Sequence, residues 1–85
     1  MSNAMQITVE MQKRQQARNM FGCDIDEFVK SVKDSITYKT AGVEMVVMSM
    51  LSDAQHEIEY NMDEAARQNL NRAKYLLTLK MQGEI

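Results

Sequence analysis

The sequence predicts an all-α fold, in which a short amphipathic helix and a long antiparallel α-hairpin follow a basic N-terminal helix. Three observations lead to this prediction. The 85 residues contain no proline. They are rich in methionine, alanine, glutamine, glutamate and lysine, which are favourable residues in a helix interior. Their apolar residues recur at three- and four-residue spacing, which is the period of a helix face.

Length and composition indicate one small domain. Residues 1–4 resemble a leader left by an expression vector, so we expect the domain over residues 5–85. A chain of this size lies near the lower limit for a self-sufficient hydrophobic core. One cysteine excludes an internal disulfide framework, and one histidine excludes a closed Cys/His zinc site within the chain. We therefore expect oligomerisation to add stability, and no cofactor.

The first helix is expected over about residues 8–21. Thr8 can cap it, and Gly22 can end it in the left-handed conformation that glycine adopts without strain. Its apolar residues are sparse, and the stretch QKRQQ is polar on every side. We expect this helix to be exposed for much of its length or docked on a partner.

The second helix is expected over residues 25–36. Asp24 followed by Glu27 is a variant of the capping box that opens a helix. Residues 37–40 should form a short connection because threonine is a poor helix former, with Thr40 capping the next helix; a continuous bent helix is the alternative. The apolar stripe that should face the core consists of Ile25, Phe28, Val29, Val32 and Ile36.

The hairpin is expected to join helices over about residues 41–60 and 64–82. Asn61 can end the first of them in the left-handed conformation, and Asp63 can cap the second. A connection of about three residues between two long helices makes the pair antiparallel. The expected facing stripes are Val43, Val47, Met50, Ala54 and Ile58 on one helix, and Ala66, Leu70, Ala73, Leu77 and Met81 on the other.

The stretch VEMVVMSML at residues 43–51 is apolar around most of the helix circumference. One hairpin partner and one short helix cannot cover that much surface, and exposed apolar patches mark interfaces. We expect a homodimer, because twofold contacts between copies are the commonest kind. The predicted interface residues are Val43, Met45, Val46, Val47, Met48, Met50 and Leu51.

Asp53, His56 and Glu57 are the candidate metal ligands, because their spacing puts two carboxylates and an imidazole on one helix face. Carboxylate-bridged di-metal bundles use Glu-x-x-His on two helices and carboxylates from two more. One chain supplies half of such a set, so only a dimer could complete it, and a solvated helix face is the favoured interpretation. Met45 and Met48 have a spacing found in Cu(I) sites, but no cysteine or histidine is near them in sequence.

No residue pattern predicts catalysis. Cys23 precedes a helix N-terminus, which favours a reactive thiolate, whereas the neighbouring Asp24 and Asp26 oppose it. No base is placed beside this thiol, and Ser49 and Ser52 lack the strand–turn–helix setting of a serine nucleophile. We expect a non-enzymatic protein.

Lys13, Arg14 and Arg18 of the first helix could contact phosphates, and they support a second hypothesis, a small nucleic-acid-associated regulator. Aromatic residues for stacking on bases are absent from this stretch. Residues 22–64 hold ten acids against three lysines, and the chain has a net charge of −2. A nucleic-acid footprint would need positive charge collected on one face, so we favour helices that neutralise one another on packing.

No stretch approaches the ~20 apolar residues of a membrane span, and no signal-peptide pattern opens the chain. We expect a cytoplasmic protein without membrane contact. The stretches MFGCDIDEFV (residues 20–29) and AARQNLNRAKYLL (residues 65–77) are similar to small uncharacterised proteins of marine T4-like cyanophages. This resemblance implies a viral accessory protein and no activity. The leading function hypothesis is a homodimeric protein-interaction module that modulates a host or viral partner.

Overall fold

The computed structural model describes residues 18–85, and this range contains helices and no strand, which confirms the all-α prediction. The elements are α2 (Ile25–Asp34), α3 (Ile36–Ala41), α4 (Val43–Glu59) and α5 (Asp63–Met81). Most of the expected first helix, with Lys13 and Arg14, lies outside the described residues. Residues 18–21 are helical, and the helix ends at Gly22, whose φ of 72° is left-handed as predicted.

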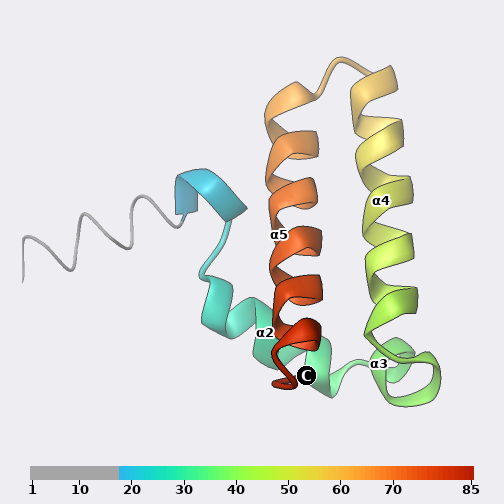
Figure 1. The fold of residues 1–85 in the computed structure, drawn as a ribbon. Helices are drawn as coiled ribbons and strands as arrows, with labels where there is room; N and C mark the ends of the chain where they lie inside the picture. Colours follow the sequence, from blue (N-terminus) through green and yellow to red (C-terminus); the bar gives the residue numbers. More distant parts are fainter. Residues whose placement is uncertain (1–17) are drawn as a thin grey trace, which may run out of the picture.

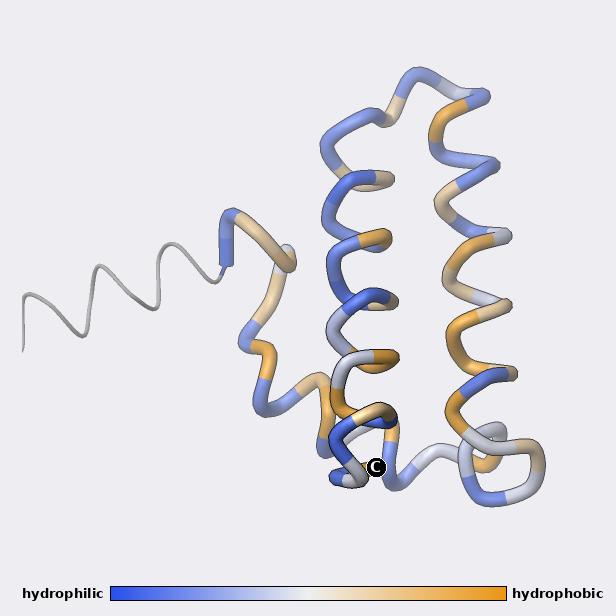
Figure 2. Tube along the Cα trace, in the orientation of Figure 1, coloured by the Kyte–Doolittle hydropathy of each residue, from blue (hydrophilic) through white to orange (hydrophobic). Residues whose placement is uncertain are grey.

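The two long helices α4 and α5 run side by side in opposite directions, and α2 and α3 lie across the end remote from their connecting turn (Figure 1). Figure 2 shows hydrophobic residues along α4 and on the side of α5 that faces it. Val32 of α2 joins these helices in one core. The buried members of this core are Val32, Val43, Val47, Met50, Ala73 and Leu76.

The turn between α4 and α5 is a Schellman motif. Asn61 has a φ of 60°, as its predicted role as a left-handed terminator requires. Its N–H donates to the Ile58 carbonyl at 3.1 Å, and the N–H of Met62 donates to the Glu57 carbonyl at 2.7 Å. The predicted cap at Asp63 is wrong, because Asp63 is already the first residue of α5 and Met62 precedes it without a side-chain hydrogen bond.

The start of α2 follows the prediction, since the Asp24 carboxylate accepts the N–H groups of Asp26 and Glu27 at 3.0 and 3.2 Å. The predicted end of this helix is wrong. The Ser35 hydroxyl accepts the N–H of Tyr38 at 3.2 Å, and this N-cap stops α2 and starts α3.

Helix α3 occupies the residues expected to form a connection. Thr40 lies inside it and donates its hydroxyl to the Ile36 carbonyl at 2.8 Å, so the predicted cap at Thr40 is wrong. Gly42, with a φ of 84°, occupies the N-cap position of α4 instead. Its left-handed backbone produces the change of direction that separates α3 from α4.

Several residues expected in the core are exposed. Ile36 is 79% exposed because it begins α3 instead of ending α2. In α5 the buried stripe is rotated from the predicted one, because α2 and residues 18–21 contact the side of α5 that carries Arg72 and Tyr75. The buried residues of α5 are Ala66, Asn69, Ala73, Leu76 and Leu79.

Candidate interaction surface

An exposed apolar surface runs along the pair formed by α4 and α5. In α4 it includes Leu51 and Ile58, which are 43% and 53% exposed. In α5 it includes Leu70 and Leu77, which are 42% and 40% exposed. Each follows a buried residue by four positions, and four residues advance about 40° beyond a full helical turn. These side chains therefore lie along the flank of the buried stripe. The buried residues four positions earlier are Val47, Ala54, Ala66 and Ala73.

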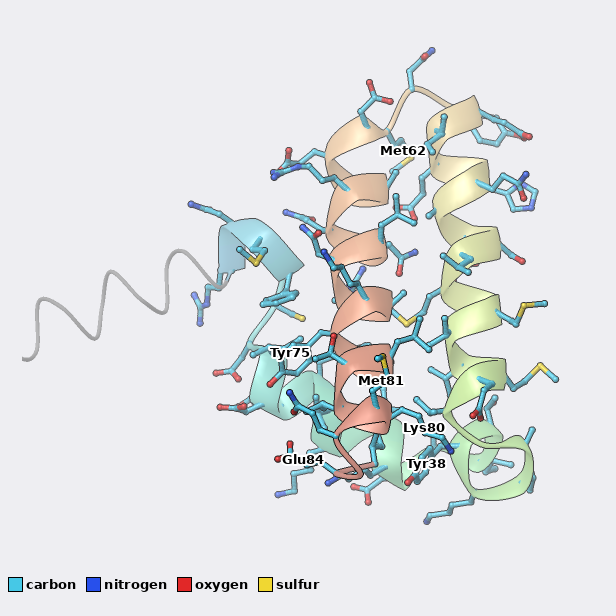
Figure 3. All side chains as sticks on the ribbon, in the orientation of Figure 1. Tyr38, Met62, Tyr75, Lys80, Met81 and Glu84 are labelled. Atoms are coloured by element: carbon cyan, nitrogen blue, oxygen red, sulfur yellow. The ribbon has the colours of Figure 1, made fainter. Side chains whose placement is uncertain are left out.

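The flanks of α4 and α5 lie on the same side of the pair because the helices are antiparallel and face each other. Helix α2 lies on the opposite side, at the end remote from the connecting turn (Figure 1), and the Arg72 guanidinium carbon lies 5.5 Å from the centre of its Phe28 ring. Figure 3 shows Met62 beside the connecting turn and Met81 near the other end of the pair. We call this surface the open face, and its residues are Leu51, Ile58, Met62, Leu70, Leu77 and Met81.

Only part of the predicted interface is available to another molecule. Val46 is partly buried against the core. Met45 and Met48 are 51% and 62% exposed, and they lie farther round α4 than Leu51. The prediction is wrong for three residues that are buried in the chain's own core, because their helix face packs against α5 and α2: Val43, Val47 and Met50.

The two helices of the pair carry opposite charge. The acids of α4 are Glu44, Asp53, Glu57 and Glu59, and this helix has no lysine or arginine. The basic residues of α5 are Arg67, Arg72, Lys74 and Lys80, and its two acids occupy its first two positions. Each helix therefore presents the charge that complements the other.

Two polar contacts cross the pair and define its register. The Lys80 Nζ lies 3.3 Å from Glu44 Oε1 at one end. Near the other end, Asn69 Nδ2 donates to Glu57 Oε1 at 3.0 Å. A backbone N–H bond to the carboxylate, together with the hydrogen bond and charge of Lys80, holds the pKa of Glu44 below its usual value.

The candidate metal ligands lie beside a hollow of about 560 Å³ on the α2 side of the pair, which Phe28 and Arg72 also line. His56 is exposed, and its Nδ1 lies 3.8 Å from Glu59 Oε2, while Glu57 accepts a hydrogen bond from Asn69. Among residues 18–85, no group of three or more His, Cys, Asp or Glu side chains is placed to hold a metal ion. The structure therefore does not bring Asp53, His56 and Glu57 together as ligands.

A second hollow, of about 620 Å³, lies between residues 19–21 and α5. Here residues 20–21 pack against α5. The rings of Phe21 and Tyr75 meet edge to face with their centres 5.5 Å apart, and Asn71 Nδ2 donates to the Met20 carbonyl at 2.9 Å. Arg18, the one nucleic-acid candidate in the described range, is exposed beside this contact. Cys23 is partly buried, and its thiol donates to the Phe21 carbonyl at 3.6 Å.

No protein-family model, curated protein or solved structure matches this chain. In the part of the chain that the structure describes, no helix is both long and apolar enough to cross a membrane.

Proposed function

We propose that the protein is a non-enzymatic protein-interaction module that forms a homodimer through the open face. The observation that supports this proposal is the row of six large apolar side chains along α4 and α5, which are between 40% and 88% exposed. Removing apolar surface from water contributes about 25 cal/mol per Å². A second molecule that covers this row therefore gains stability that the single chain cannot supply.

The dimensions of the pair suit such an association. Helix α4 has 17 residues and α5 has 19, so each is roughly 25–30 Å long. Two such pairs packed face to face make a four-helix bundle, whose helices bury apolar stripes of this length against one another. A chain of 85 residues buries little apolar surface by itself, and the bundle adds buried surface between the two copies.

The proposed role extends to a second protein. The open face is used between copies, whereas the exposed Met45 is six residues before Leu51, lies about 120° farther round α4 and stays outside the contact between copies. Methionine adapts its shape to irregular surfaces and is common at interaction sites. Together with the resemblance to cyanophage proteins, this leads us to propose an accessory protein that contacts a host or viral partner.

Sedimentation equilibrium over a range from about 1 to several hundred micromolar tests the dimer. We expect the dimer mass for the wild type and the monomer mass for Ile58→Glu, because a carboxylate on the open face must lose its water on association. The matched control is Ile36→Glu, since Ile36 is 79% exposed on α3 and lies outside the open face. It should stay dimeric. A wild type that remains monomeric at the highest concentration refutes the proposal.

A further inference from the structure

We infer that the second copy binds with its α4 over α5 of the first, so that the twofold axis runs parallel to the helices. This inference rests on the proposed function, since it specifies the partner surface and orientation in the homodimer. When two copies meet face to face, the twofold axis lies in the interface plane. It runs either along the helices, which places α4 over the partner's α5, or across them, which places like helices together.

The charges of the helices distinguish these two arrangements. Toward the open face, α4 presents Glu44 and Glu59 and no lysine or arginine, while α5 presents Arg67 and Lys74. The remaining acids of α4 line the hollow on the α2 side. An axis across the helices brings the two acidic helices into contact, and like charges across an interface oppose association. An axis along the helices places each acidic α4 on a basic α5 in both halves of the bundle. Charge complementarity therefore favours the parallel axis.

The register within one chain identifies which residues meet. Rotation about an axis parallel to the helices keeps every residue at its own level along the bundle. Glu57 is level with Asn69, because their side chains are hydrogen bonded at 3.0 Å. Glu59 is two residues farther along α4 and is therefore level with Arg67 in the antiparallel α5. In the dimer, the partner's Glu59 lies at the level of Arg67.

Both residues lie at an edge of the open face that the parallel axis brings together. Glu59 is eight residues after Leu51, so it lies about 80° farther round α4, away from α5. Arg67 is three residues before Leu70 and lies about 60° farther round α5, away from α4. Because α4 lies over the partner's α5, these outer edges coincide. The Arg67 and Glu59 side chains are 58% and 66% exposed, so both can reach a second molecule.

Both side chains have local partners in the single chain, and these contacts do not prevent the proposed pairing. Arg67 pairs with Glu64 at 2.8 Å, and Glu59 lies 3.8 Å from His56. Exposed pairs of this kind contribute little to stability because water screens them. A bidentate guanidinium can also hold a second carboxylate while keeping the first.

Charge reversal tests the pairing through the dimer dissociation constant. Arg67→Glu and Glu59→Arg should each weaken the dimer by about tenfold, since each reversal turns an attraction into a repulsion and the contact occurs twice. The double variant should restore the wild-type constant to within about threefold. Lys30→Glu is the matched control for Arg67→Glu, because Lys30 is exposed on α2 and the two variants change the net charge by the same amount. It should leave the constant within about twofold.

A distance measurement tests the axis directly. Spin labels on Tyr60→Cys, in a Cys23→Ser background, report how far apart the two connecting turns lie. With the parallel axis both turns are at one end of the bundle, and the labels should be about 15–25 Å apart. An axis across the helices separates them by roughly a helix length more. A dimer with distant labels, or one in which the charge reversals do not compensate, overturns this orientation and leaves the proposed homodimer standing. A monomeric wild type overturns both.

Discussion

Leu76→Ala should destabilise the fold by about 3 kcal/mol, whereas the same change at the adjacent Leu77 should cost about 1 kcal/mol. Leu76 is 0% exposed and belongs to the core cluster. Truncation removes three carbon atoms from contact with their neighbours, about 2.4 kcal/mol at ~0.8 kcal/mol each, and leaves a cavity that adds to this cost. Leu77 is 40% exposed, so water fills the space and part of the surface is wet already.

Urea unfolding followed by circular dichroism measures both values. The measurement is best made in the Ile58→Glu background, where dissociation of the dimer does not contribute to the free energy of unfolding. The two variants differ by one position in α5 and lose the same atoms, so helix propensity cancels between them. Equal losses at the two positions would refute the assignment of Leu76 to the core and of Leu77 to the open face.

Two further predictions concern a turn and an ion pair. Gly22→Ala should cost slightly more than Gly83→Ala. Both glycines are left-handed, with φ of 72° and 76°, but at Gly22 a Cβ would lie 2.6 Å from the Gln68 side-chain oxygen, so the Gln68 amide must turn aside and give up its 3.4 Å hydrogen bond to the Asn19 carbonyl. The free energy of unfolding from urea titrations should fall by about 1 kcal/mol at Gly83 and by more at Gly22. Equal losses would contradict a role for the Gln68 contact. For Glu44, the lowered folded pKa means stability that is present above the ordinary carboxyl pKa of 4.5 and is lost as pH falls through the folded value. Glu44→Gln should therefore be less stable than wild type at pH 7 and converge with it near pH 3, and a difference independent of pH would count against the Lys80 pairing.

The ends of the helices were predictable where a single residue determines the backbone. Gly22 and Asn61 both adopt the left-handed conformation expected of them, and Asp24 caps α2 through its own side chain. The region from Ser35 to Gly42 was not predictable in the same way. Serine occurs both inside helices and at N-caps, so the residue type alone does not predict that Ser35 caps α3 and divides the segment.

Of the open face, only Leu51 was predicted to lie at an interface, because periodicity identifies an apolar stripe and not its centre. In α5 the apolar residues occupy a broad sector, in which Leu70 and Leu77 fit a core stripe as well as Leu76 and Leu79 do. Which of these leucines is buried depends on the side of the helix pair on which α2 packs. That packing is a tertiary contact, which the local sequence does not determine. The signal that the sequence did contain was the breadth of the sector, since one neighbouring helix buries only part of it.

The small size of the central residues explains why this chain keeps apolar surface exposed. Ala54, Ala66 and Ala73 lie at the contact between α4 and α5 and are 1–2% exposed. Alanine at such positions allows two helices to approach closely, because the separation of packed helices depends on the side chains between them. The larger side chains four residues later, Ile58, Leu70 and Leu77, then project from the flank instead of filling the contact. The pair is joined tightly at its centre, and its larger side chains are left for a surface that α2 cannot cover, because α2 already lies on the other side.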